Sequence, residues 1–444
     1  MRRWTTSVIL LAILLPPVAA AQTVRARPVL VLPFAVKGAE GDGWVGEGVA
    51  ELLALAFSNH HAVSPINRAR LARVGVEGAV DERGALVAGR ALKADLVLFG
   101  EIERTGGHWT IHPRLLGSRA GGSEAGRIEP MSGAEDQFFN LVGQVALAYL
   151  NRFSVAVSAD EAKRIRRASI VTENWRAFEA YVKGRRMFVA ETTAGNEGAA
   201  ELFARAIEID PNFAVAHYYL GMAQLRLGNR WKAAAQFRAA TQVDASVPEP
   251  YKALGDLFMA SPRRLHDQAI EAYQRAIEIR PFYADAYVGI GDVRAAKGQA
   301  DPAIADYQKA LSFNPLNPRV YVSLGKIYFA EKGLYYEAVE AYKRAIEIDA
   351  NFVEARMGLG EVYEDKGLYR EAVEEYTKVV EQDPAHTGAL YNLALVYEKV
   401  DPKEAVARWE RYIAVASQIP SEKDWVDVAR QHIRKLKGQL EKGN

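Results

Sequence analysis

The stretch Ala284–Asn317 reads ADAYVGIGDVRAAKGQADPAIADYQKALSFNPLN, and its spacing decides the fold of more than half of the chain. Small and apolar residues recur in it at helical spacing, first Tyr287, Ile290 and Gly291, then Ala303, Tyr307 and Ala310. Gly298 ends the first helix and Pro315 ends the second. Small side chains suit the points where two antiparallel helices approach closely, and aromatic side chains fill the layer between neighbouring pairs. The stretch therefore predicts one helix-turn-helix unit of about 34 residues.

The same pattern recurs in six further units along the chain. Their marker residues are Tyr181, Gly184, Ala199, Phe203, Ala206 and Pro211; Gly221, Ala233, Phe237 and Ala240; Gly255, Ala269, Tyr273, Ala276 and Pro281; Gly325, Ala338, Tyr342 and Ala345; Leu359, Gly360, Tyr363, Ala372, Tyr376 and Pro384; Leu393, Ala394, Tyr397, Ala405 and Trp409. The pattern resembles the tetratricopeptide repeat family, with seven units over residues 177–416. Ala245 and Ala350 replace the closing proline, and short insertions fall at Thr193–Asn196 and Ser261–Leu265. The resemblance implies an all-α solenoid, a right-handed superhelix of stacked helix pairs.

Composition describes an ordinary globular protein with material for two parts. The chain has 444 residues, of which 49% are hydrophobic and 25% charged, and its formal net charge is +1. A nucleic-acid-binding protein normally shows a basic face, so this balance gives no reason to expect nucleic acid as a partner.

Residues 1–21 have the layout of a secretory signal peptide. Arg2 and Arg3 precede an apolar run at Val8–Leu15, and small residues at Ala19–Ala21 place the mature start at Gln22. An uncleaved anchor is the alternative. The chain has no cysteine, so disulfides, thiolate metal sites and a lipid-modified amino-terminal cysteine are excluded. We expect a periplasmic or secreted protein with no transmembrane segment after signal cleavage, and not a lipoprotein.

Residues 26–153 predict a small α/β domain. Its expected order is strand, helix, strand, helix, two or three antiparallel strands and a closing helix. Three segments, Val29–Phe34, Gly48–Leu53 and Ala94–Glu101, resemble the amino-terminal domain of TolB and related domains that precede tetratricopeptide arrays. The loop between Gly117 and Gly126 departs from that pattern. The resemblance implies a role in envelope-associated assemblies, without catalysis.

Two segments flank the predicted array. Residues 154–176 contain a basic run, formed by Lys163, Arg164, Arg166 and Arg167, for which a solvated helical linker is favoured over a docking patch. Residues 421–440 predict an amphipathic helix that caps the last repeat, because a terminal unit needs a polar outer face.

The sequence contains only weak matches to motifs for cofactor binding, metal binding or catalysis. Gly41–Gly46 matches G-x-G-x-x-G, but the preceding strand ends too early, Trp44 is bulky where phosphate would pass, and no carboxylate follows at the ribose position. His60 and His61 are adjacent, so their side chains should point apart, and no third ligand stands at metal-like spacing. We therefore expect no enzyme, no cofactor and no metal.

The remaining candidate is a protein-binding groove. In the tetratricopeptide family the first helix of each pair lines a concave surface, and by register the candidate residues here are Tyr218, Met222, Leu225, Lys252, Asp256, Asp292, Lys326, Phe329, Met357, Glu361, Glu364, Tyr391 and Leu395. The hypothesis is an extended peptide or helix anchored by Tyr218, Met222, Phe329 and Tyr391, with a basic residue near Glu361 and Glu364. The alternative is that these are exposed residues on a spacer.

Taken together, the sequence predicts an exported scaffold that binds protein or peptide partners in the bacterial cell envelope. The runner-up is a periplasmic sensing module that binds a small ligand in the amino-terminal domain.

Overall fold

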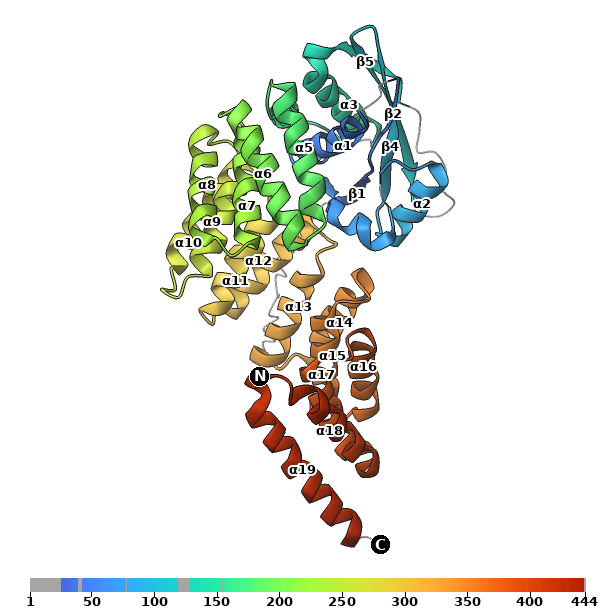
Figure 1. The fold of residues 1–444 in the computed structure, drawn as a ribbon, viewed down its shortest axis with the longest axis vertical. Helices are drawn as coiled ribbons and strands as arrows, with labels where there is room; N and C mark the ends of the chain where they lie inside the picture. The colour runs from blue at the N-terminus through green and yellow to red at the C-terminus, as the bar shows by residue number, and fades with distance from the viewer. Residues whose placement is uncertain (1–24, 39–41, 77, 119–127, 154, 443–444) are drawn as a thin grey trace, which may run out of the picture.

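The structure, a computed structural model, describes residues 25–38, 42–76, 78–118, 128–153 and 155–442. The predicted signal peptide and most of the loop expected between Gly117 and Gly126 lie outside these residues. A small α/β domain stands at the upper right in Figure 1, and a curved array of helix pairs runs beside and below it. This arrangement confirms the predicted fold class.

The α/β domain is built on one mixed sheet. Its strands are β1 (Arg27–Val31), β2 (Ala35–Lys37), β3 (Val63–Pro65), β4 (Leu96–Thr105), β5 (His108–Gly117) and β6 (Met131–Ala134). They lie in the order β3-β1-β4-β5-β6, with β2 paired to β4. β1 runs parallel to β3 and β4, whereas β4, β5 and β6 are antiparallel. A turn at Gly106 and Gly107, both at positive φ, joins β4 to β5.

Helices cover both faces of this sheet. They are α1 (Gly43–Phe57), the 3-10 helix η1 (Arg68–Val74), α2 (Glu82–Ala91), the 3-10 helix η2 (Glu135–Gln137) and α3 (Phe138–Arg152). Successive strand residues point to opposite faces, so Val29 and Val31 pack with α1 and α3 while Leu30 and Leu32 pack with α2 and η1. The sheet core is therefore two apolar layers. The resemblance to the TolB amino-terminal domain stays a prediction.

The glycine motif has a packing explanation. Helix α1 begins at Gly43, so Gly43 and Gly46 of the motif lie within the first turn of a helix. A Cβ atom at Gly46 would lie 1.9 Å from the carbonyl oxygen of Phe34, so only glycine lets α1 approach the end of β1 this closely. Trp44 is buried instead of bordering an open phosphate site. The motif shapes the core of the domain.

Seven consecutive helix pairs follow within the described residues. Their helices are α5 (Trp175–Val189) and α6 (Thr193–Ile209), α7 (Ala214–Arg226) and α8 (Arg230–Val243), α9 (Glu249–Met259) and α10 (His266–Ile279), α11 (Ala284–Ala296) and α12 (Ala300–Phe313), α13 (Pro318–Lys326) and α14 (Tyr335–Ile348), α15 (Val353–Asp365) and α16 (Tyr369–Gln382), and α17 (Thr387–Val400) and α18 (Pro402–Ala416). Within a pair, glycine meets an aromatic ring: a Cβ at Gly291 would lie 2.7 Å from the ring of Tyr307. The small residues thus stand at close helix contacts.

The fifth pair carries an extra residue. Gly325 and Ala338 are 13 positions apart, whereas the equivalent Gly291 and Ala303 are 12 apart. A π-helical turn, η3 (Ile327–Glu331), absorbs the difference, and its wide turn includes a 3.2 Å hydrogen bond from the Lys332 amide to the Ile327 carbonyl. The insertion distorts one helix and leaves the stacking of pairs intact.

Two more helices lie outside the pairs. The basic run lies on a helix, α4 (Ala159–Ser169), and its Lys163, Arg166 and Arg167 are exposed as a solvated helix predicts. The other face packs against α1 and α3 with Ile165 and Ser169 fully buried, so this helix is not a free linker. At the other end, a short 3-10 turn, η4 (Pro420–Glu422), leads into α19 (Lys423–Lys442). α19 places Val426, Ala429 and Leu436 in the core of the last pairs.

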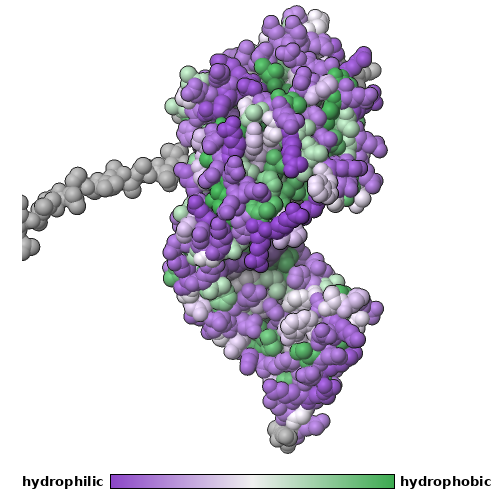
Figure 2. Space-filling model, turned by 90° about the vertical axis from the view of Figure 1, so that its left-hand side faces the viewer, coloured by the Kyte–Doolittle hydropathy of each residue, from purple (hydrophilic) through white to green (hydrophobic). Residues whose placement is uncertain are grey.

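The α/β domain and the first helix pair share one continuous core. Trp44 of α1 packs against Trp175 of α5 with ring centroids 5.0 Å apart, and Phe139 of α3 lies 5.1 Å from Phe178 of α5. Figure 1 shows α5 directly beside α1 and α3. The face seen in Figure 2 is mostly hydrophilic, with hydrophobic residues gathered in patches on its upper part.

Candidate protein-binding groove

The predicted groove residues all lie on the first helices of their pairs. They are Tyr218, Met222 and Leu225 on α7, Lys252 and Asp256 on α9, Asp292 on α11, Lys326 and Phe329 on α13 and η3, Met357, Glu361 and Glu364 on α15, and Tyr391 and Leu395 on α17. Their surroundings differ along the array, so the groove is best described in three parts.

The upper part of the groove is covered by the α/β domain. Tyr218 and Met222 line a cavity of about 360 Å³ whose other walls include Leu55 of α1 and Ile66 near η1. The amide of Ala26 donates to the carbonyl of Ser312 at 2.9 Å, which ties the start of the sheet to the fourth pair. Tyr218 and Met222 of α7 therefore face the α/β domain across this cavity.

A buried charge cluster holds that cover in place. Glu51 of α1 is 5% exposed and accepts hydrogen bonds from Arg68 at 2.8 Å and from Arg185 of α5 at 3.2 Å. Burial alone would raise the pKa of Glu51, but the two guanidinium groups lower it below its ordinary value. The guanidinium of Arg185 also lies 3.9 Å from the ring centre of Tyr219. Both arginines therefore depend on one carboxylate.

The middle part of the groove is polar and internally paired. Asp256 accepts from Lys252 at 2.7 Å and from the hydroxyl of Tyr273 at 2.8 Å. Asp292 accepts in the same way from the hydroxyl of Tyr307 at 2.8 Å. Burial lowers the pKa of Lys252, but Asp256 and neighbouring Asp285 raise it above its ordinary value. These charges are already satisfied within the chain.

The lower part of the groove carries an acidic cluster, which we define as Glu361, Glu364 and Asp365 of α15. Burial raises the pKa of Glu361, and the Lys326 charge opposes this only in part. Burial also raises the pKa of Glu364, helped by the charges of Glu361 and Asp365, although the hydroxyl of Tyr376 donates to Glu364 at 3.3 Å. Among the described residues none of these three carboxylates forms an ion pair, and Lys326 acts on Glu361 without one.

The last groove residues meet the terminal helix. Tyr391 lies between the rings of Trp409, 5.0 Å away, and Trp425 of α19, 5.5 Å away. Trp425 itself is 53% exposed. Tyr391 is therefore packed within an aromatic group, while Trp425 extends that group to the surface.

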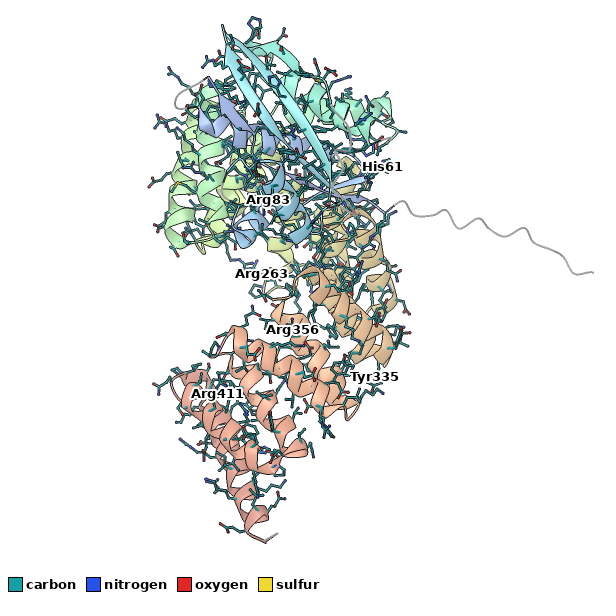
Figure 3. The ribbon with its side chains drawn as sticks, turned by 90° about the vertical axis from the view of Figure 1, so that its right-hand side faces the viewer. His61, Arg83, Arg263, Tyr335, Arg356 and Arg411 are labelled. Carbon is teal, nitrogen blue, oxygen red and sulfur yellow. The ribbon has the colours of Figure 1, made fainter. Side chains whose placement is uncertain are left out.

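The two histidines differ from their predicted arrangement. Their rings do not point apart but stack with centroids 4.6 Å apart, and the fold brings Glu161 of α4 within 2.7 Å of the Nδ1 atom of His61. Burial alone would raise the pKa of Glu161, but hydrogen bonds from His61 and Ser158 lower it to about 2. Figure 3 shows His61 at the junction between the sheet and the repeats.

This trio is a poor metal site despite its geometry. Its ligand atoms lie within 4.8 Å of one another. However, Nδ1 of His60 accepts from the Ala62 amide at 3.1 Å, and Nε2 faces the carbonyl of Ala156 at 3.2 Å, so Nε2 carries the proton. A metal needs a free nitrogen lone pair, and His60 has none to offer in this arrangement.

Family comparison identifies the helix pairs. A model described as TPR repeat matches residues 266–298, 291–332 and 329–367, and two described as tetratricopeptide repeat match residues 202–236 and 353–386. The helix pairs within these ranges are tetratricopeptide repeats. The recognition made from spacing is confirmed for this part of the chain.

Solved tetratricopeptide structures resemble parts of the array. A crystal structure of MamA is 27% identical and covers 37% of this chain and 95% of its own, with a TM-score of 0.32. YrrB, described as a TPR protein with an unusual peptide-binding site, is 25% identical over 46% of this chain and 99% of its own, with a TM-score of 0.36. PilF of Pseudomonas aeruginosa is 16% identical over 51% of this chain and 97% of its own, with a TM-score of 0.43. Comparison with curated proteins gave no match.

Sequence reasoning missed the residues that join the α/β domain to the tetratricopeptide repeats. Glu51 stands between buried apolar neighbours of α1, Val49 and Ala50 on one side and Leu52 and Leu53 on the other, and a carboxylate among buried positions signals a paired charge. Its partner Arg185 sits in the first repeat, 134 residues away, at a position that sequence spacing alone leaves unassigned.

Proposed function

We propose that this protein is an exported scaffold that holds a protein partner in the lower groove of its tetratricopeptide array. Tetratricopeptide repeats are protein-interaction modules. One observation carries the proposal: among the described residues, none of the three carboxylates of the acidic cluster, Glu361, Glu364 and Asp365, forms an ion pair within the chain. A partner segment bearing lysine or arginine would supply the missing charge, with an apolar side chain packing near Met357.

Location in the bacterial envelope is part of the same proposal. The layout of residues 1–21 supports export, and amino-terminal sequencing of the protein from intact cells should find Gln22 first. Among the described residues, none of the helices has both the length and the hydropathy that crossing a bilayer requires.

A charge-matched comparison tests the groove. The double variant Glu361→Gln, Glu364→Gln removes two charges from the groove, and Glu371→Gln, Glu374→Gln removes two exposed charges from α16. Crosslinking in intact cells followed by mass spectrometry should recover a partner with the wild type and with the α16 variant, and much less with the groove variant. The crosslinked partner segment should be basic. Equal recovery by all three proteins would remove the acidic cluster from the proposal.

A further inference from the structure

A second cavity lies between α4 and the loops of the first three repeats. It measures about 460 Å³, within the range of small-molecule sites, and such sites favour the interfaces between domains. One wall comes from α4 and Leu55 of α1, and the other comes from Val215, Val247 and Ile279 of the repeats. It is separate from the acidic cluster and opposite to it in charge.

The cavity contains more positive charge than its own acids neutralise. Arg167 pairs with Asp244 at 3.1 Å, and Arg280 pairs with Glu249 at 2.7 Å. Two more cations from the basic run of α4, Lys163 and Arg164, also line the cavity. Among the described residues neither of these forms an ion pair, and Asp160 is the one acid left in the lining to oppose them.

Two buried arginine N–H donors that line the cavity lack an acceptor, which also favours an anionic ligand. The Nε atoms of Arg164 and Arg280 are buried and have no hydrogen-bond acceptor among the described residues. The side chain of Arg280 is only 7% exposed, so water does not readily replace a missing acceptor. A buried guanidinium with an open N–H is costly unless a negative group completes its bonds.

The remaining lining is apolar. Leu55, Val215, Val247 and Ile279 present hydrocarbon next to the cationic end, and Ile170 and Val171 extend it. A small inorganic anion would satisfy the charges and leave this surface wet. A neutral hydrophobic molecule would do the reverse.

We propose that this cavity binds an amphiphilic organic anion, whose carboxylate or phosphate head group is held by Lys163 and Arg164 and whose apolar part packs against the repeats. Because its walls come from both α4 and the array, the ligand stabilises the contact between the two parts. Lys163, Arg164 and Arg167 of the basic run then form one wall of a ligand-binding cavity, while Arg166 lies outside it. The site also lies between the two parts and not within the amino-terminal domain alone.

The test compares four probes on the full-length mature chain. Decanoate and decyl phosphate carry both features, whereas decanol lacks the charge and acetate lacks the apolar part. Thermal unfolding and isothermal titration calorimetry, below the micelle concentration of each probe, should show a raised melting temperature and saturable one-to-one binding with a decyl anion only. Whichever of decanoate and decyl phosphate binds with the higher affinity identifies the preferred head group, carboxylate or phosphate. Absence of binding by both, or equal effects from decanol, would overturn the proposal.

Variants separate the site from general detergent binding. Lys163→Gln with Arg164→Gln should weaken binding at least tenfold, while Arg166→Gln, an exposed cation of the same helix outside the cavity, should leave it unchanged. Val247→Trp fills the cavity without altering charge and should also block binding, and circular dichroism verifies that each variant folds. If Arg166→Gln weakened binding as much as the double variant, the binding would be non-specific and the proposal would fail.

Discussion

Removing the carboxylate of Glu51 should weaken the joint between the α/β domain and the repeats. In Glu51→Gln the side chain keeps its volume but loses its charge, so Arg68 and Arg185 stay buried without a counter-ion. Breaking a buried ion pair from one side typically costs about 3–5 kcal/mol, and we expect a loss of this size in the free energy of unfolding. The measurement is urea unfolding followed by tryptophan fluorescence, since Trp44 and Trp175 lie at the joint.

A surface pair provides the control. Glu101 bonds Lys37 at 2.6 Å, but their side chains are 47% and 58% exposed, so Glu101→Gln should cost about 0–1 kcal/mol. If the donor–acceptor distance alone set the cost, Glu51→Gln and Glu101→Gln would have similar effects. Burial, and not the existence of an ion pair, is the deciding quantity.

The pH dependence of this loss has a definite sign. Because the folded state lowers the pKa of Glu51 below its ordinary 4.5, the ion pair stabilises the fold above that pH and loses its effect as the pH falls through the folded pKa. The difference between wild type and Glu51→Gln should therefore be greatest at neutral pH and shrink in acid. A cost below about 1 kcal/mol at neutral pH, or a cost independent of pH, would refute the reasoning.

Three further predictions address the array. Gly291→Leu should overpack the contact with Tyr307 and cost about 1–3 kcal/mol in urea unfolding, whereas Gly438→Ala, with no atom near its added Cβ, should cost nothing measurable. Glu361→Gln should stabilise the free protein by about 0.2–0.5 kcal/mol at neutral pH, because it removes a partly desolvated charge whose raised pKa favours the protonated form. The gain should vanish in acid, and a loss of stability would contradict this. Leu436→Ala on α19 should cost about 2–5 kcal/mol and loosen the last repeat in hydrogen exchange, while an unchanged exchange rate would show that α19 does not cap it.

The repeats were predictable because their determinants are local. Gly291, Ala303 and Tyr307 lie within one 34-residue unit, and each identity follows from a contact inside that unit. The order of strands and helices in the α/β domain was likewise readable from short periodic runs. Its caps are local too, since the Asp81 side chain accepts from the Gly84 amide at 2.8 Å at the start of α2.

The closed groove was not predictable because its determinants are distant in sequence. Register identifies which residues of α7 and α9 face inward, but it does not say what lies opposite them. Tyr218 meets the cavity wall at Leu55 because α1 happens to fit the curvature of the first repeats, and that fit depends on shapes built more than a hundred residues apart. The prediction that the two histidines point apart, with no third ligand nearby, was wrong for the same reason. Glu161 reaches them only through the packing of α4.

The position of the α/β domain also follows from the physics of repeats. Each helix pair hides its apolar face against a neighbour, so the first pair needs a cover that no preceding repeat provides. Trp175 and Phe178 of α5 find that cover in Trp44 and Phe139 of the α/β domain, just as the last pair finds Val426 and Leu436 of α19. A cap that is itself a folded domain extends beyond the first pair and occupies part of the concave surface. The proposed partner site and the proposed ligand cavity lie where this geometry leaves surface free: the acidic cluster on α15 in the lower repeats, and the cationic cavity between α4 and the first repeats.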